Sequence, residues 1–325
     1  GEPVAFFYTP CFLRGEELEN IKAHVERATA LFDHVIDLYL EKEDFRKLFD
    51  FPKEIEELIL LDSPLPRKFP MARMDIFYRG IDDFTFCEIN TDGSSAMNED
   101  RVLTELFKDS LLYQDLKEKG IQMNEFELFS SWVDTVYNYW KEERPPVIGI
   151  LDTKVDHDEF RRYAKHFEER GARVHLVTPW ELDLEDGYLS YQGEKLDLIY
   201  RRLVTTDLYS IYDEVPKLIQ GIKEGKTLFF GPITSQVIHN KMLFAVLYHK
   251  EAQQYFSEEE KQWIKAHIPY TAVVDERILA DEHYVYEKDR YLLKPMDSYA
   301  SRGIFVGKEM SEADWKSLLE AVVGR

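Results

Sequence analysis

Residues 72–90 read ARMDIFYRGIDDFTFCEIN, and this stretch determines the predicted fold. Its two halves, residues 72–78 and 84–90, contain the aromatic and β-branched side chains that favour strands. Residues 79–83, between the halves, supply the glycine and aspartates that tight turns favour. We therefore predict a β-hairpin.

Four polar side chains of this hairpin are predicted to share one site. Alternate residues of a strand point to the same face, which groups Arg73 with Asp75 and Glu88 with Asn90. If the hairpin folds symmetrically about its turn, Asp75 lies opposite Glu88, and Arg73 lies opposite Asn90. Facing Cβ atoms would then be about 5 Å apart.

Two facing carboxylates repel each other unless a cation lies between them. Carboxylate and amide oxygens favour a hard ion, and Mg²⁺ is typically held by one or two carboxylates together with substrate phosphates. The residues alone are equally compatible with an ordinary surface hairpin in which Arg73 neutralises the acids. A magnesium–nucleotide site is thus one of two interpretations at this point.

The composition excludes several classes of partner. The 325 residues include 62 acids and 41 bases, and this net charge of -21 argues against binding nucleic acid or an acidic membrane. A negative surface suits a cationic amine substrate, but solubility alone also explains it. No targeting segment, zinc spacing or disulfide framework is visible around Cys11 and Cys87, so we expect a cytoplasmic protein. The sequence does not indicate an oligomeric state.

Three regions follow from the pattern of elements along the chain. The dipeptide Pro145-Pro146 is the clearest boundary. Before it, residues 1–145 combine helices with the hairpin. Residues 146–231 alternate strands and helices as a Rossmann-like α/β domain does, without a three-glycine dinucleotide fingerprint. Residues 232–325 alternate helices with short strands, which predicts an α+β lid.

The expected elements carry the periodicities of helices and strands. Helices are predicted over residues 15–42, 96–119, 125–143, 158–170, 213–224, 241–254 and 258–267. Strands outside the hairpin are predicted over residues 147–151, 172–177, 196–200, 227–230, 284–286, 291–294 and 304–306.

Two pairs of cations are further candidates for the site. Lys294 ends a predicted strand and precedes a small polar loop whose backbone N–H groups suit phosphate oxygens, and Lys241 begins a predicted helix. A plain turn and a solvated lysine are the alternatives. Arg201 and Arg202 follow a strand of the middle region, where ligands of open α/β sheets bind, so one of these arginines is predicted to bind a substrate carboxylate or phosphate. An interdomain salt bridge is the alternative.

The order of these motifs resembles that of a known family. Arg-x-Asp at 73–75, Glu-x-Asn at 88–90, a βαβ region, Asn-Lys at 240–241 and Leu-Lys-Pro at 293–295 together resemble the circularly permuted ATP-grasp proteins, specifically the synthetase part of glutathionylspermidine synthase. The resemblance covers about residues 65–310. It implies a circularly permuted ATP-grasp-like fold with an inserted Rossmann-like pre-ATP-grasp domain.

The resemblance also implies roles for individual residues. Asp75, Glu88 and Asn90 would hold Mg²⁺, while Arg73 would stabilise charge during phosphoryl transfer. The residues implied to contact ATP are Lys241 and Lys294, which reach its phosphates, and the overlying loop residues Ser298, Ser301, Arg302 and Gly303. ATP and Mg²⁺ are the implied cofactors.

The implied activity is that of an ATP-dependent C–N ligase. A small-molecule carboxylate would be converted to an acyl phosphate and then joined to an amine as an amide, with neither substrate identified. Two departures from the family matter: the loop before Gly303 is poor in glycine, and the chain ends at Arg325 soon after the second lid strand. We therefore expect a truncated chain, and a nucleotide-binding or assembly protein without ligase turnover is the alternative.

Overall fold

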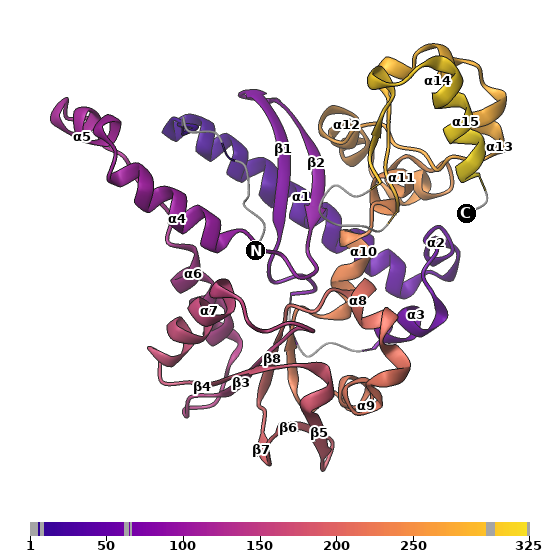
Figure 1. Ribbon diagram of the computed structural model, residues 1–325. Coiled ribbons are helices and arrows are strands. Elements are labelled where there is room, and N and C mark those ends of the chain that lie inside the picture. The colour runs from indigo at the N-terminus through magenta and orange to yellow at the C-terminus, as the bar shows by residue number, and fades with distance from the viewer. Residues whose placement is uncertain (1–5, 7–9, 62–64, 66, 297–302, 324–325) are drawn as a thin grey trace.

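The computed structural model describes residues 6, 10–61, 65, 67–296 and 303–323. In Figure 1 the hairpin stands upright at the centre, above a small parallel sheet. A pair of helices projects to the upper left, and the C-terminal elements form a separate unit at the upper right.

The described residues form a mixed α/β structure. The α-helices are α1 (Gly15–Glu41), α2 (Glu43–Arg46), α3 (Lys53–Ile59), α4 (Met97–Lys108), α5 (Leu111–Glu118), α6 (Leu128–Tyr139), α7 (Asp158–Glu168), α8 (Thr205–Ser210), α9 (Pro216–Glu224), α10 (Gln236–His239), α11 (Met242–Tyr248), α12 (Glu258–His267), α13 (Glu276–Ala280), α14 (His283–Tyr286) and α15 (Glu312–Val322). The 3₁₀ helices are η1 (Pro179–Glu181), η2 (Tyr212–Glu214), η3 (Ile233–Ser235), η4 (Ala252–Tyr255), η5 (Lys288–Arg290) and η6 (Gly307–Glu309). The strands are β1 (Arg73–Gly80), β2 (Asp83–Asn90), β3 (Val147–Leu151), β4 (Arg173–Val177), β5 (Leu182–Glu185), β6 (Tyr188–Tyr191), β7 (Glu194–Lys195), β8 (Leu198–Arg201), β9 (Leu228–Phe230), β10 (Leu292–Leu293) and β11 (Phe305–Val306).

A four-stranded parallel sheet organises the middle of the chain. Its strand order is β4-β3-β8-β9, and β3 pairs in parallel with both β4 and β8. Aromatic side chains of α6 and α7, among them Trp132 and Tyr163, fill a core on one face. Leu189 of β6 and Leu218 of α9 belong to the larger core on the other face. Burial on both faces explains the uninterrupted apolar sequence of β3.

The β1–β2 hairpin packs on the larger core through one face. Phe84, Phe86 and Ile89 are at most 3 % exposed. Phe86 contacts Trp263 of α12 with ring centroids 5.8 Å apart. At the tip, Asp82 of the turn accepts hydrogen bonds from Asn20 and His24 of α1. The opposite face of the hairpin is therefore left available for polar chemistry.

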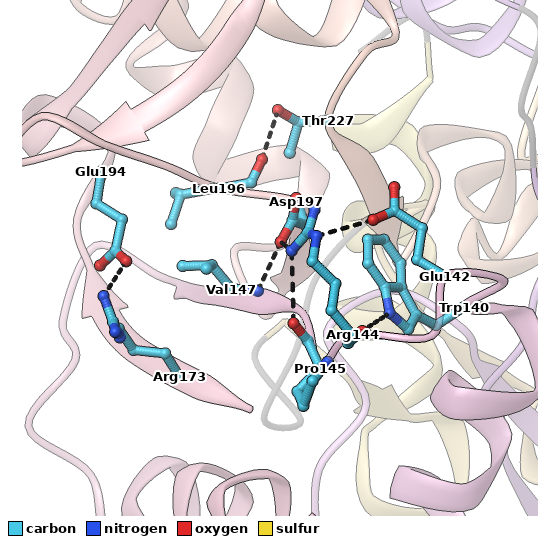
Figure 2. A network of polar contacts seen from close by, with 10 residues as sticks. All are labelled: Trp140, Glu142, Arg144, Pro145, Val147, Arg173, Glu194, Leu196, Asp197 and Thr227. Atoms are coloured by element: carbon cyan, nitrogen blue, oxygen red, sulfur yellow. Dashed lines mark hydrogen bonds and ion pairs between the residues drawn. The ribbon is translucent and has the colours of Figure 1, made fainter. Parts of the chain in front are cut away.

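One end of the parallel sheet is tied by an ion pair whose aspartate is buried and whose arginine is half exposed. Asp197, just before β8, accepts two hydrogen bonds of 2.7 Å from the Arg144 guanidinium and one of 2.8 Å from the Val147 amide (Figure 2). Burial opposes ionisation, but these donors hold the pKa of the Asp197 carboxyl below its usual value. This network fixes the amino ends of β3 and β8.

Several predicted elements differ from the structure. The predicted helix 96–119 is two helices, α4 and α5, because Ser110 ends the first and its hydroxyl caps the second by accepting the Tyr113 amide. Residues 284–286, predicted as a strand, lie in helix α14, where the Tyr284 carbonyl accepts a hydrogen bond from the Trp315 indole of α15. Tertiary packing outweighs the β-propensity of its tyrosines and valine there.

Other predicted helices are shorter. Helix 125–143 is reduced to α6, and helix 241–254 to α11 followed by the 3₁₀ helix η4. Helix 213–224 begins only at Pro216, whose fixed φ suits the first helical position. In the described part of the chain, none of the helices is long and apolar enough to cross a bilayer.

Candidate functional site

The two predicted cross-strand pairs are confirmed, although the hairpin is not symmetric along its whole length. Asp75 of β1 pairs with Glu88 of β2, and Arg73 pairs with Asn90. The turn is made by Ile81 and Asp82, and Asp82 has a φ of 58°. The facing carboxylates required for a shared cation site are therefore cross-strand neighbours.

A β-bulge at Cys87 modifies the simple alternation of side chains. The pairing shifts by one residue between Asp75 and Ile76, so that Cys87 has no direct partner on β1. Two consecutive side chains consequently reach lysines: the Cys87 Sγ is 3.9 Å from the Lys294 Nζ, and a Glu88 Oε1 is 3.2 Å from the Lys241 Nζ. A second shift near Arg79 restores the register at the turn.

The acids of the hairpin are paired with bases. The Arg73 Nε donates to Asp75 Oδ1 at 2.9 Å, and its Nη2 donates to Oδ2 at 3.3 Å. These two side chains are about 40 % exposed, whereas Glu88 and Lys241 are mostly covered, at 24 % and 17 %. The site therefore contains the carboxylates of Asp75 and Glu88 and three cationic side chains, which are Arg73, Lys241 and Lys294.

Backbone contacts bring the two lysines together. Lys241 immediately precedes α11, and its amide donates to the Met296 carbonyl at 2.9 Å. Met296 lies two residues after Lys294, so one hydrogen bond aligns both lysine-bearing segments. Gly303 has a φ of +72°, and a Cβ added there would be 3.2 Å from the Pro295 Cγ. Gly303 therefore lies beside the Lys294 segment. Ser298, Ser301 and Arg302 lie outside the described residues.

The electrostatic environment of Cys87 reflects this convergence. Burial raises the pKa of the Cys87 thiol, and the nearby carboxylates of Glu88 and Asp75 raise it further. The Lys294 ammonium acts in the opposite direction. The raised pKa of Cys87 disfavours the thiolate, which fits a packing role.

The donor set is suited to Mg²⁺ more than to softer metals. Among the described residues, no group of three or more His, Cys, Asp or Glu side chains could hold a metal. The hairpin offers two carboxylates and the Asn90 amide, whose buried Nδ2 makes no hydrogen bond to any described residue. A set of this size fits an ion that keeps waters and takes further ligands from substrate phosphates.

Arg201 occupies a structural position. Its side chain is fully buried and forms an ion pair with Asp92, which follows β2. It also donates to the carbonyls of Gly231 at 2.6 Å and Leu203 at 2.5 Å. These contacts favour the interdomain salt bridge over the predicted substrate contact for Arg201.

Arg202 has a different environment. It lines a small cavity between the hairpin end, at Thr91 and Ser94, and the parallel sheet, at Tyr200. Its Nη2 donates to Glu159 Oε2 at 3.1 Å, a further side-chain hydrogen bond joins it to Tyr200, and its guanidinium lies over the Tyr200 ring. A guanidinium at the wall of a cavity is suited to an anionic ligand.

Sequence reasoning did not identify the segment that links these features. Residues 91–94, Thr-Asp-Gly-Ser, contain Asp92 and the cavity-lining Thr91, Gly93 and Ser94. The available signal was a run of small and turn-forming residues directly after the metal-ligand strand. Glu159, the partner of Arg202, could not be linked to the hairpin from the sequence, because its helix α7 begins roughly seventy residues after the hairpin ends.

Comparisons with known proteins bear on the fold. No protein-family model matches the sequence, and no curated protein matches it. A solved structure of a glutathione synthetase-like effector from Globodera pallida, in its apo form, does match, with a TM-score of 0.57. The match covers 94% of this chain and 71% of the effector, at 12% sequence identity.

This chain has a glutathione synthetase-like fold. The resemblance drawn from the sequence is thereby confirmed at the level of the fold, since an identity of 12% carries no more than that. The mixed α/β architecture with its parallel sheet agrees with it. The domain boundaries and the circular permutation stay predictions.

Proposed function

We propose that this protein is an ATP-dependent carboxylate–amine ligase of the circularly permuted ATP-grasp type, similar to glutathionylspermidine synthase. The observation that supports this most is the convergence of the hairpin acids with two lysines from remote segments, at 3.2 Å between Glu88 and Lys241 and 3.9 Å between Cys87 and Lys294. The glutathione synthetase-like fold agrees with this proposal.

Each charged group of the site has a defined task in this proposal. Lys241 and Lys294 bind the phosphates of ATP as point charges. Asp75, Glu88 and Asn90 are the residues that hold Mg²⁺, which when bound neutralises phosphate charge. Arg73, kept in orientation by Asp75, stabilises the charge that develops on the transferred phosphoryl group.

The reaction has two steps. A substrate carboxylate oxygen attacks the γ-phosphorus of ATP, the bond to the bridging oxygen breaks, and ADP leaves. The amine nitrogen then attacks the carbonyl carbon of the acyl phosphate, inorganic phosphate leaves, and the amine proton passes to solvent. The cationic side chains lower the repulsion between the carboxylate and the phosphates, and exclusion of water protects the acyl phosphate.

Arg202 is the residue that we propose for binding the substrate carboxylate. Its side chain lines a cavity that Thr91 and Ser94 of the hairpin end also line. A planar guanidinium binds a carboxylate with two parallel hydrogen bonds. Because Thr91 directly follows the metal-ligand strand β2, a carboxylate bound there would lie near the phosphoryl donor.

A nucleotide-binding measurement tests the proposal. We expect adenylyl imidodiphosphate, a non-hydrolysable ATP analogue, to bind in calorimetric titration only when Mg²⁺ is present. Absence of Mg²⁺-dependent binding would overturn the proposal.

Turnover distinguishes a ligase from a binding or assembly protein. The protein should release ADP when supplied with pools of carboxylates and amines, and neither pool alone should suffice for amide formation. Analogue binding without ADP release in any combination would favour the alternative, a protein that retains the ATP-grasp scaffold without ligase activity.

A further inference from the structure

The ends of two strands from different regions of the chain are joined by a buried ion pair. Asp92 lies two residues after Asn90 of β2, and Arg201 is the last residue of β8. Their side chains are both 0% exposed, and the Arg201 Nη2 is paired with Asp92 Oδ1. Burial alone would raise the pKa of Asp92, but Arg201 and neighbouring groups lower it below its usual value.

The ion pair is part of a dense backbone connection. The second oxygen of Asp92 accepts the Thr205 amide at 2.6 Å. Arg201 donates to the Gly231 and Leu203 carbonyls, so its guanidinium ties together the loops that follow β8 and β9. Removal of either partner would therefore release contacts between three segments.

The chain approaches itself closely at this point. Gly93 has a φ of +58°, and a Cβ added there would be 2.6 Å from the Arg202 carbonyl oxygen. The adjoining loop is also tied on its other side, because the Thr91 hydroxyl donates to the Ser235 carbonyl at 2.8 Å and the Ser94 hydroxyl donates to the Asn90 carbonyl. Residues 90–94 are thus held from both sides.

We propose that Asp92 and Arg201 are positioning residues, which act on the reaction through the residues beside them. The pair fixes the carboxyl end of β2 against the carboxyl end of β8. It thereby sets the place of Asn90, in the metal-ligand set, relative to Arg202, which follows Arg201 and lines the carboxylate cavity. This inference rests on the proposed ligase function, because Asn90 and Arg202 have their tasks only there.

The chain offers a matched control at the other end of the same strand. Asp197 and Arg144 also form an aspartate–arginine pair, but at the amino end of β8 (Figure 2). The functional groups of the two pairs are the same. The pairs differ in their position along β8 and in exposure, because the Arg144 side chain is 51% exposed while that of Arg201 is 0% exposed.

The test compares two double variants. Asp92→Asn/Arg201→Met removes the positioning pair without leaving an uncompensated buried charge, and Asp197→Asn/Arg144→Met does the same for the control pair. The Mg²⁺ concentration for half-maximal binding of adenylyl imidodiphosphate is then measured by calorimetry. Folding is checked by circular dichroism, with all titrations well below each unfolding temperature.

We expect the required Mg²⁺ concentration to rise by about 10- to 100-fold in the positioning variant, as when groups that orient metal ligands are removed. In the control variant it should change by less than about twofold. An equal change in the two variants, or no change in either, would overturn the inference while leaving the proposed function intact.

Hydrogen exchange of the amides of residues 88–94 supplies a readout that does not depend on nucleotide. It should quicken in the positioning variant and stay unchanged in the control variant. If the unaltered protein binds no analogue, the proposed function fails, and the inference fails with it as a statement about catalysis. Unchanged exchange in the positioning variant would overturn the role of the pair in holding the loop, whatever the binding result.

Discussion

A Glu88 carboxylate oxygen lies 3.2 Å from the Lys241 ammonium, which joins the metal-ligand hairpin to the last third of the chain. The pair is mostly covered by protein, so its charges are screened less by salt than those of a surface pair. The carboxylate is also the group that would hold Mg²⁺. Mg²⁺ and Lys241 would therefore both contact the Glu88 carboxylate. For this reason Glu88 is the most informative residue to change.

Replacing Glu88 by glutamine keeps the shape of the side chain and removes its charge. We expect Glu88→Gln to weaken Mg²⁺-dependent analogue binding by about 100-fold or more, because a direct ligand should matter at least as much as an orienting partner. Calorimetry checks this. The matched control is Asp83→Asn, on the same strand but paired with Arg79 at the turn, and it should bind as the unaltered protein does. Equal binding by the two variants would remove the metal assignment.

The hairpin should be anchored by its buried face. Phe86 is fully buried against Trp263, and Phe86→Ala is expected to lower the free energy of unfolding by about 3–5 kcal/mol, since it leaves a cavity. Phe77, on the same hairpin, is 57% exposed, and Phe77→Ala should change the free energy of unfolding by less than about 0.5 kcal/mol. Urea unfolding measures both values. Similar losses in the two variants would contradict the burial of one face only.

The glycine after Asp92 should not tolerate a side chain. Gly93→Ala combines a positive φ with a Cβ placed 2.6 Å from the Arg202 carbonyl oxygen, so we expect a loss of more than about 1 kcal/mol. Gly80 of the hairpin also has a positive φ, but nothing lies within 4 Å of an added Cβ. Gly80→Ala should therefore lower the unfolding temperature less than Gly93→Ala does. A larger loss in Gly80→Ala would show that Gly93 does not lie close to the Arg202 carbonyl.

Acid should loosen the contact between the hairpin and α12. Burial lowers the pKa of His267, and the Coulombic effect of His24 lowers it further. The unfolded chain then binds more protons than the folded protein as pH falls through about 6.5, so stability is lost on acidification through this range. The groups facing His267 are His24 and Arg27 of α1 and Asp82 of the turn.

His267→Asn checks this pH dependence. The asparagine amide can still donate to the Phe84 carbonyl, which accepts the His267 Nδ1 hydrogen at 3.1 Å. Between about pH 7.5 and 5.5, the fall in unfolding temperature should be smaller in this variant. In His157→Asn, at an exposed position, the fall should equal that of the unaltered protein. An unaltered fall in His267→Asn would assign the acid sensitivity elsewhere.

Much of the site was accessible from the sequence because its information is local. Two short strands around a turn with Gly80 and Asp82 fix the register, and the register alone sets Asp75 opposite Glu88. Strand β3, which contains Gly149, could also be predicted from the sequence, because a short apolar run bounded by turn residues is typical of a buried strand. The order of the motifs then led to the fold that the comparison with the effector supports.

The rest depended on contacts between distant segments. From the sequence alone Arg201 and Arg202 are equivalent neighbours, yet Arg201 forms an ion pair with Asp92 whereas Arg202 donates to Glu159 and lines a cavity. The bulge at Cys87 was also invisible, because it arises from how β2 pairs with β1.

The sequence by itself determined the hairpin, the pairing of Asp75 with Glu88 and the kinds of ligand it presents, since these follow from backbone alternation and turn chemistry over nineteen adjacent residues, 72–90. Only the tertiary structure decided which cations lie beside those ligands and which arginine forms the ion pair with Asp92. The physical reason is that a buried charge must be matched by a partner brought from elsewhere in the chain, and the partner is chosen by packing rather than by local sequence.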